Sequence, residues 1–148
     1  MKEARVLVLC DYYLPGFRAG GPVRTIANTV SRLGDEFDFS IVTRNRDAGR
    51  AGTSFDLPEG DWIAVGKARV LYLSTWKLHG ISWRRLMRRG NYDVVQLNSL
   101  FSRISIRFLA LRRLRLVPAV PVVLAPRGEL SLGALSLKRW RKRAFLLL

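Results

Sequence analysis

The sequence is poor in the residues that build metal and redox sites. Among its 148 residues there is one cysteine and one histidine. A single cysteine excludes an intramolecular disulfide and suits a reducing compartment. Cys10 lies in the apolar run RVLVLC, so we interpret it as a small core residue rather than a nucleophile. His79 alone cannot bind a metal, and as a general base it would need a carboxylate or a substrate beside it. The sequence therefore predicts no metal site and leaves the catalytic residue unknown.

Long apolar runs are also missing. No window approaches the ~18 uncharged apolar residues that a membrane-spanning helix needs. The start, MKEARVLVLCD, has too short an apolar segment for a signal peptide. An apolar fraction of 49% is typical of a globular protein, and the length fits one domain. We therefore expect a cytoplasmic protein of a single domain.

Acidic residues are scarce relative to basic ones. The chain has 26 Lys and Arg against 11 Asp and Glu, a net charge of +15. Nine arginines fall between residues 84 and 115, and five cations fall within LKRWRKR at 137–143. Such a balance predicts an acidic partner. The candidates are a nucleic acid, an anionic lipid surface and a phosphorylated small molecule. The alternative is that these cations only lie on the solvent-exposed faces of helices and bind no partner.

Apolar segments and turn signals predict an alternation of strands and helices. Strands are expected at 5–10, 38–44, 68–74, 92–98 and 121–126, with a short one around 62–65. Helices are expected at 22–33, at 81–89, after Ser99 or Ser102, and from about Leu135. The strands are short apolar runs with little alternation, as in buried parallel sheets. The pattern predicts an α/β fold with a doubly wound, mainly parallel, Rossmann-like sheet and helices on both faces.

The first predicted strand is followed by a glycine-rich loop, DYYLPGFRAGG, before the helix that Pro22 begins. A strand order of 3-2-1-4-5 would bring Gly20 and Gly21 beside Asn98, at the point where the winding of the sheet reverses. Glycines leave room for a ligand, and the N–H groups of the following helix favour an anion or a hydroxyl. Asn98 can donate to and accept from sugar hydroxyls. The alternative is that Gly-Gly-Pro only makes a tight turn into the helix.

The fifth predicted strand runs into the segment PRGE at 126–129. Arg127 offers a planar fork that fits phosphate or carboxylate groups. It lies one strand further from the loop, and Glu129 follows it closely. We count Arg127 and Glu129 as candidate binding residues. The alternative is that Arg127 pairs with Glu129 or Asp93 and binds nothing else.

Three segments together resemble a known family. They are VLVLCDYYLPGFRAGGPVRTIANTVSRL, YDVVQLNSLFS and APRGELSLGALSLKRWRKRAFLLL. The set is similar to the N-terminal domain of the family-4 type, retaining, nucleotide-sugar-dependent glycosyltransferases, which have two Rossmann domains in the GT-B architecture. The resemblance implies that the chain is one half of a GT-B fold. The chain ends on AFLLL inside an expected helix, so we expect it to be part of something longer, with the donor-binding domain absent.

The resemblance also implies how the domain is used. Gly20 and Gly21 match the family's glycine loop in the interdomain cleft, near the donor's phosphates and the acceptor. Arg127 and Glu129 border the acceptor side. Some relatives have a histidine or aspartate where this sequence has Gln96 to Asn98, so the segment carries no catalytic assignment. We expect a sugar acceptor and a nucleotide sugar as ligands, no cofactor, no obligatory metal and no turnover by this chain alone.

Partners other than sugars are the remaining alternatives. Many relatives work on lipid-linked or cell-envelope glycans at the inner membrane face, so the LKRWRKR helix is a candidate for peripheral contact with anionic lipid. Its leucines would otherwise pack against the sheet or the missing domain. A basic α/β domain that binds nucleic acid or another anion is the alternative function. We consider nucleic acid the weaker option, because no stacking aromatics are interleaved with the basic runs and no known motif occurs. A receiver domain would need clustered acids at the strand ends, and only Asp11 qualifies.

Overall fold

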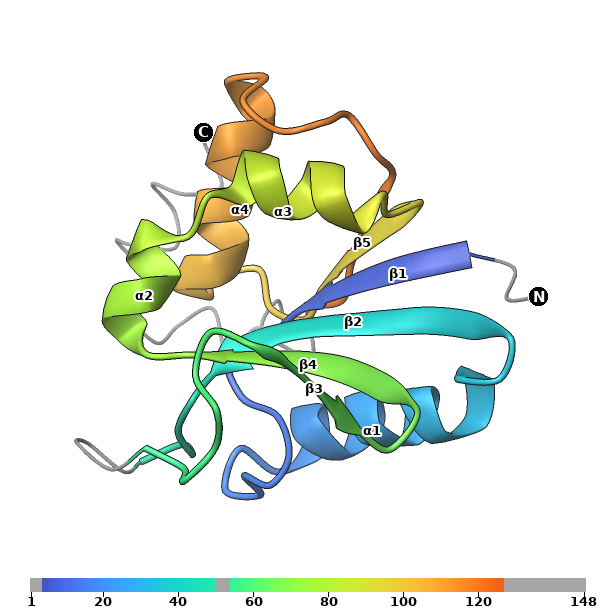
Figure 1. The fold of residues 1–148 in the computed structure, drawn as a ribbon, viewed down its shortest axis with the longest axis vertical. Helices are drawn as coiled ribbons and strands as arrows, with labels where there is room; N and C mark the ends of the chain where they lie inside the picture. Colours follow the sequence, from blue (N-terminus) through green and yellow to red (C-terminus); the bar gives the residue numbers. More distant parts are fainter. Residues whose placement is uncertain (1–3, 50–53, 127–148) are drawn as a thin grey trace, which may run out of the picture.

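The computed structural model describes residues 4–49 and 54–126. Within them lies a six-stranded sheet with the strand order β3-β4-β2-β1-β5-β6 (Figure 1). The strands are β1 (Ala4–Leu9), β2 (Phe37–Arg44), β3 (Trp62–Val65), β4 (Ala68–Leu73), β5 (Val94–Leu97) and β6 (Val122–Leu124). All neighbouring pairs are parallel except β3 with β4, which is antiparallel. The predicted α/β class, the mainly parallel sheet and the order of the five main strands are confirmed, and the short strand adds an edge.

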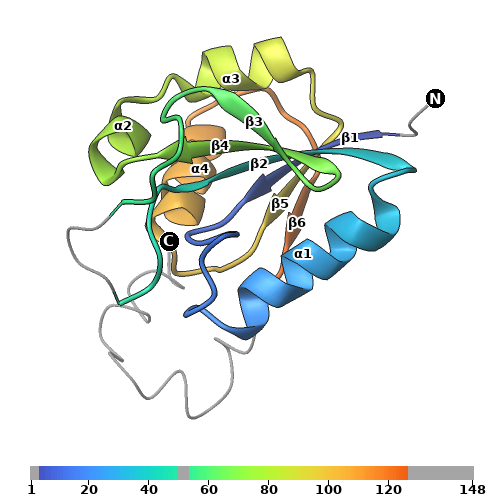
Figure 2. The ribbon, with the colours of Figure 1, turned by 60° about the horizontal axis from the view of Figure 1, so that its bottom comes forward.

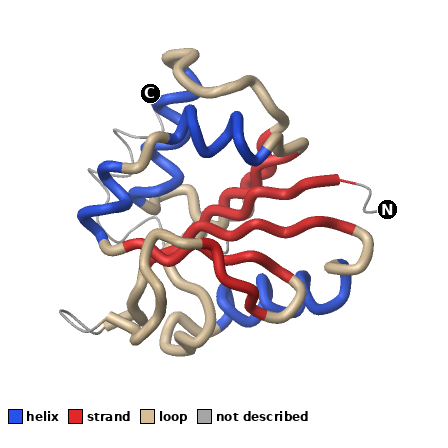
Figure 3. Tube along the Cα trace, viewed as in Figure 1, coloured by secondary structure: helices blue, strands red, loops and turns tan. Residues whose placement is uncertain are grey.

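Helices lie on both faces of this sheet (Figures 1 and 2). They are α1 (Gly21–Leu33), α2 (Thr75–Gly80), α3 (Trp83–Gly90) and α4 (Arg103–Arg113). Figure 3 shows α1 on one side of the strands, whereas α3 and α4 lie on the other. The arrangement follows from the parallel strands, since each crossover must run along a face of the sheet.

Two hydrophobic clusters fill the space between the sheet and the helices. Successive side chains along a strand point to opposite faces, and the alternate residues of β1 divide accordingly. Leu7 and Leu9 join the cluster of α3 and α4, with Trp83, Met87, Ile104 and Phe108. Val6 and Val8 join the cluster of α1, with Ile26 and Val30. The central strand is therefore buried on both sides, as its continuous apolar run predicts.

The segment at 75–90 differs from the prediction of a single helix at 81–89. It forms two short helices, because two serines cap separate starts. The Ser74 hydroxyl accepts a hydrogen bond from the Lys77 N–H at 3.3 Å, and the Ser82 hydroxyl accepts from the Arg85 N–H at 3.4 Å. Ile81 between them is extended, with φ −61° and ψ 132°. Such N-caps satisfy donors that have no partner within the helix.

Two further predictions concern the starts of helices. Of the two candidate caps for the helix after β5, Ser102 is the one used, since its hydroxyl accepts from the Ser105 N–H at 3.1 Å. The last predicted helix, from about Leu135, lies outside the described residues, and so do Arg127 and Glu129. In the described part of the chain, no helix is long and apolar enough to cross a membrane.

Candidate functional site

The loop between β1 and α1 requires glycine at one of its two candidate positions. Gly20 is the N-cap of α1 and has φ 66° and ψ −124°, a conformation that side-chain-bearing residues rarely adopt. Gly21 has no positive φ, and a Cβ added there would meet no atom within 4 Å. Pro22 begins the helix without loss, because the first N–H groups of a helix have no partner within it. Gly20 is therefore explained by backbone shape, whereas Gly21 leaves space open beside a helix start.

The loop and the end of β5 meet at the carboxyl edge of the sheet, as the strand order predicts. Both segments leave the strands at the same edge (Figure 2). They enclose a pocket of about 200 Å³ that is lined by Cys10, Asp11, Tyr12, Ala19, Pro22, Val23, Ile26, Asn98 and Ser99. Ala19 and Pro22 flank the two glycines on either side. The structure thus brings the loop and Asn98 together around one pocket, but Gly20 and Gly21 themselves do not line it.

Asn98 is buried and held in place by its neighbours. Its backbone N–H donates to the Leu9 carbonyl at 3.1 Å, which extends the pairing of β1 with β5 by one residue. Its side-chain oxygen accepts from the Gln96 amide nitrogen at 3.2 Å. Fixed polar groups of this kind, in a pocket with apolar walls, are typical of ligand sites. We call this the carboxyl-edge pocket.

Two arginines that we did not assign from the sequence lie at the same edge. Arg44, the last residue of β2, forms an ion pair with Asp11 at 3.0 Å, and its guanidinium lies over the ring of Tyr12 at 5.9 Å from the centroid. Arg44 and Arg46 line a neighbouring hollow of about 170 Å³ that includes Ser74 and Thr75. Among the described residues, neither buried Nε atom has a hydrogen-bond partner. A half-buried guanidinium that lines a hollow suits an anionic ligand.

The sequence did carry a signal for these arginines. Both belong to the run TRNR, which follows the second predicted strand directly. Because the carboxyl ends of parallel strands meet at one edge, polar residues at the end of β2 fall beside those that follow β1. They were not assigned, because Arg44 ends the predicted strand and Arg46 belongs to the aperiodic stretch that follows it.

The carboxylate of Asp47 stabilises the loop between β1 and α1 through hydrogen bonds to its backbone. Its carboxylate accepts hydrogen bonds from the backbone N–H groups of Phe17 at 3.1 Å, Arg18 at 3.2 Å and Ala48 at 2.7 Å. Desolvation raises the pKa of this carboxyl, but the three N–H groups and the Arg18 charge outweigh it and leave the pKa below its ordinary value. The ionised carboxylate therefore stabilises the loop at neutral pH.

We expect the loop to loosen in acid because of Asp47. Its folded-state pKa is lowered, so its stabilising effect is complete above the ordinary value of about 4 and is lost as the pH falls through the lowered one. Nuclear magnetic resonance (NMR) of the Phe17 and Arg18 amides between pH 7 and 2 should show a shared transition below pH ~4. In an Asp47→Asn variant this transition should disappear. A midpoint above the ordinary value would contradict the assignment.

The two residues that often carry catalysis have other roles here. Cys10 is buried, as predicted, and desolvation raises its pKa to about 12. A thiol of that kind is no nucleophile at neutral pH. His79 is exposed on α2, and its Nδ1 contacts the carbonyl of Thr75 one turn earlier. Within the described ranges, no group of three or more His, Cys, Asp or Glu side chains is placed to hold a metal ion.

Comparison of the chain with protein-family models, with curated proteins and with solved structures found no match.

Proposed function

We propose that the chain is the acceptor-side domain of a nucleotide-sugar-dependent glycosyltransferase. In this proposal the sheet is doubly wound and Rossmann-like, and it forms one half of a two-domain GT-B architecture. The observation that carries the proposal is one pocket lined both by Asn98 and by Ala19 and Pro22, the two residues that flank Gly20 and Gly21 in the loop. That pocket lies between β1 and β5, where the chain reverses its direction of travel across the sheet. Ligands of open α/β sheets bind at such reversal points.

The groups around the pocket suit a sugar that is joined to a phosphate. Asn98 offers an amide in a buried setting, and amides can bond two hydroxyls at once. The start of α1 offers backbone N–H groups and the positive end of a helix dipole. Arg44 and Arg46 are half-buried and line the neighbouring hollow. We assign sugar hydroxyls to Asn98 and anionic groups to the helix start and the two arginines.

Catalysis in this proposal needs a second, donor-binding domain. Transfer from a nucleotide sugar is accelerated by groups that stabilise the departing diphosphate. In the family that the sequence resembles, a metal is not obligatory, because cationic side chains and helix N-termini do this. The acceptor-side domain positions the attacking hydroxyl and closes one wall of the cleft. Peripheral contact with an anionic membrane surface, if the acceptor is lipid-linked, belongs to the same proposal.

Binding without turnover is the expected behaviour of the purified chain. We expect it to bind one class of oligosaccharide in a calorimetric screen, because the carboxyl-edge pocket is formed within this domain. We expect no release of nucleoside diphosphate from UDP-, GDP- or ADP-sugars, because the donor-binding groups lie elsewhere. Turnover by this chain alone would contradict the assignment to the acceptor side. Failure to bind any glycan of the panel would contradict the function.

A further inference from the structure

A second site is indicated by an unusual division of one face of the sheet. On the face that α3 covers, each of three neighbouring strands is polar where it begins and apolar where it ends. The sequence of side chains is Arg5, Leu7, Leu9 on β1; Asp38, Ser40, Val42 on β2; and Arg69, Leu71, Leu73 on β4. The apolar ends join the core beneath α3 and α4. The polar starts form a separate floor toward the amino ends of the strands, away from the carboxyl-edge pocket.

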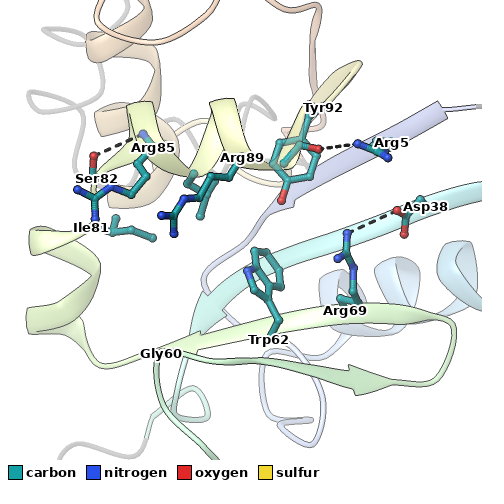
Figure 4. Close-up of a pocket in the computed structure, with 12 residues that line it drawn as sticks. Arg5, Asp38, Gly60, Trp62, Arg69, Ile81, Ser82, Arg85, Arg89 and Tyr92 are labelled. Carbon is teal, nitrogen blue, oxygen red and sulfur yellow. Dashed lines mark hydrogen bonds and ion pairs between the residues drawn. The ribbon is translucent and has the colours of Figure 1, made fainter.

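This polar floor is the base of a groove. Helix α3 belongs to the connection between β4 and β5, and its buried side chains pack on the apolar ends of the strands. The connection between β2 and β4 carries β3, which pairs antiparallel at the edge of the sheet. A groove of about 530 Å³ lies between α3 and the edge formed by β3 and β4 (Figure 4). We call it the α3 groove; its volume is in the range of small-molecule sites.

Four arginines and one aspartate line the α3 groove. Arg69 lies 3.5 Å from Asp38 and donates to the Ser40 hydroxyl at 3.3 Å. Arg5 donates to the Gly90 carbonyl at 3.4 Å. Asp38 is thus paired with Arg69, and the net charge of the side chains that line the groove is positive. Such a concave cationic surface concentrates anions.

The two arginines of the helix are the ones available to a ligand. Arg85 and Arg89 lie one turn apart on α3, and both line the groove. In the described part of the chain, no acidic side chain forms an ion pair with either. Guanidinium groups at this spacing can bind a phosphate with several parallel hydrogen bonds.

An aromatic ring faces them from the other side. Trp62, on β3, is 38% exposed and extends into the groove opposite Arg89 (Figure 4). Its ring already contacts the Arg69 guanidinium, at 5.9 Å from the centroid. An exposed indole beside cations can stack on a planar ring, as in many nucleotide-binding sites.

We propose that the α3 groove binds a phosphorylated small molecule of nucleotide size. The phosphate lies on Arg85 and Arg89, and a planar ring stacks on Trp62. The recessed shape favours this occupant over a membrane surface, which would meet protruding side chains. It also favours it over a nucleic-acid strand, because of the two aromatic residues that line the groove only Trp62 is exposed for stacking, whereas Tyr92 is buried. The site is independent of the carboxyl-edge pocket and remains if the glycosyltransferase assignment fails.

The test compares two double variants that remove the same charge from the same helix. Arg85→Gln/Arg89→Gln changes the groove, whereas Arg84→Gln/Arg88→Gln changes two exposed arginines of α3 that do not line it. Calorimetric titration with metal-free ADP should show binding to the wild type. The groove variant should lose at least about ten-fold in affinity, because two charge-assisted contacts are removed. The control variant should stay within about two-fold, since exposed charges contribute little. Circular dichroism melting should show that all variants are folded.

A second comparison tests the ring. Wild type should bind ADP more tightly than inorganic pyrophosphate, and Trp62→Leu should remove that difference, because only ADP offers a planar ring. Equal losses in both double variants would overturn the proposal in favour of general electrostatic attraction. So would an absence of ADP binding at millimolar concentration. Binding of phosphatidylglycerol vesicles or of an oligonucleotide that depends on Arg85 and Arg89, without ADP binding, would also overturn it and assign the groove to a macromolecular partner.

Discussion

Replacing Phe108 by alanine is expected to lower the free energy of unfolding by about 3–5 kcal/mol. Phe108 is fully buried on α4, and its ring packs edge-on against Trp83 of α3 with 5.9 Å between the centroids. The variant would lose the transfer energy of a large side chain and leave a cavity between the two helices and the sheet. Because small domains are stable by only about 5–15 kcal/mol, this is a large part of the total.

The control for this variant is Phe17→Ala. Phe17 is 74% exposed in the loop between β1 and α1, so its removal should change stability by less than about 0.5 kcal/mol. Urea denaturation followed by far-ultraviolet circular dichroism measures both. Equal, small effects would contradict the packing of α3 and α4 on one face of the sheet. That packing affects both proposed sites. Helix α3 forms one wall of the α3 groove, and the segment that contains Asn98 leads into α4.

Gly21→Leu is expected to weaken acceptor binding by about ten-fold or more, which corresponds to a loss of about 1.4 kcal/mol of binding free energy. Gly21 has an ordinary backbone conformation and open space around it, so the fold should tolerate leucine with a change below about 1 kcal/mol. The new side chain would occupy the space beside the start of α1, where a ligand must approach the helix N–H groups. Gly20 is unsuitable for this test, because its positive φ would strain any other residue.

Ser31→Leu serves as the matched control for Gly21→Leu. Ser31 is exposed near the other end of α1, so the substitution adds the same side chain to the same helix far from the pocket. Calorimetric titration with the glycan that wild type binds should show no change for this variant. Equal affinity in all three proteins would contradict a role for the start of α1 in binding.

Much of the fold was predictable from the sequence because the strands are short, apolar runs separated by clear turn signals. Runs such as RVLVLC and the helix start at Gly21–Pro22 depend on local physics alone, and these appear in the structure where they were predicted. The division of residues 75–90 into two helices was missed. It depends on two serine caps of modest strength, which compete with the apolar periodicity that the sequence displays.

The candidate sites were predictable only where local sequence and strand order were enough. The glycine loop and Asn98 both follow predicted strands directly, so the edge rule brings them together. Arg44 and Arg46 obey the same rule but were hidden by the irregular stretch that follows them. The α3 groove could not be predicted, because it depends on the strand register, which pairs Arg5 with Asp38 and Arg69 with Ser40.

The most direct test of the central claim is an NMR titration of the isotope-labelled chain with an oligosaccharide acceptor found by the binding screen. The amide signals of Gly20, Gly21, Asn98 and Ser99 should shift together and saturate with one dissociation constant. Signals of the α3 groove, such as those of Trp62 and Arg89, should stay in place. Binding that shifts only residues away from the carboxyl edge, with Gly21 and Asn98 unchanged, would contradict the account.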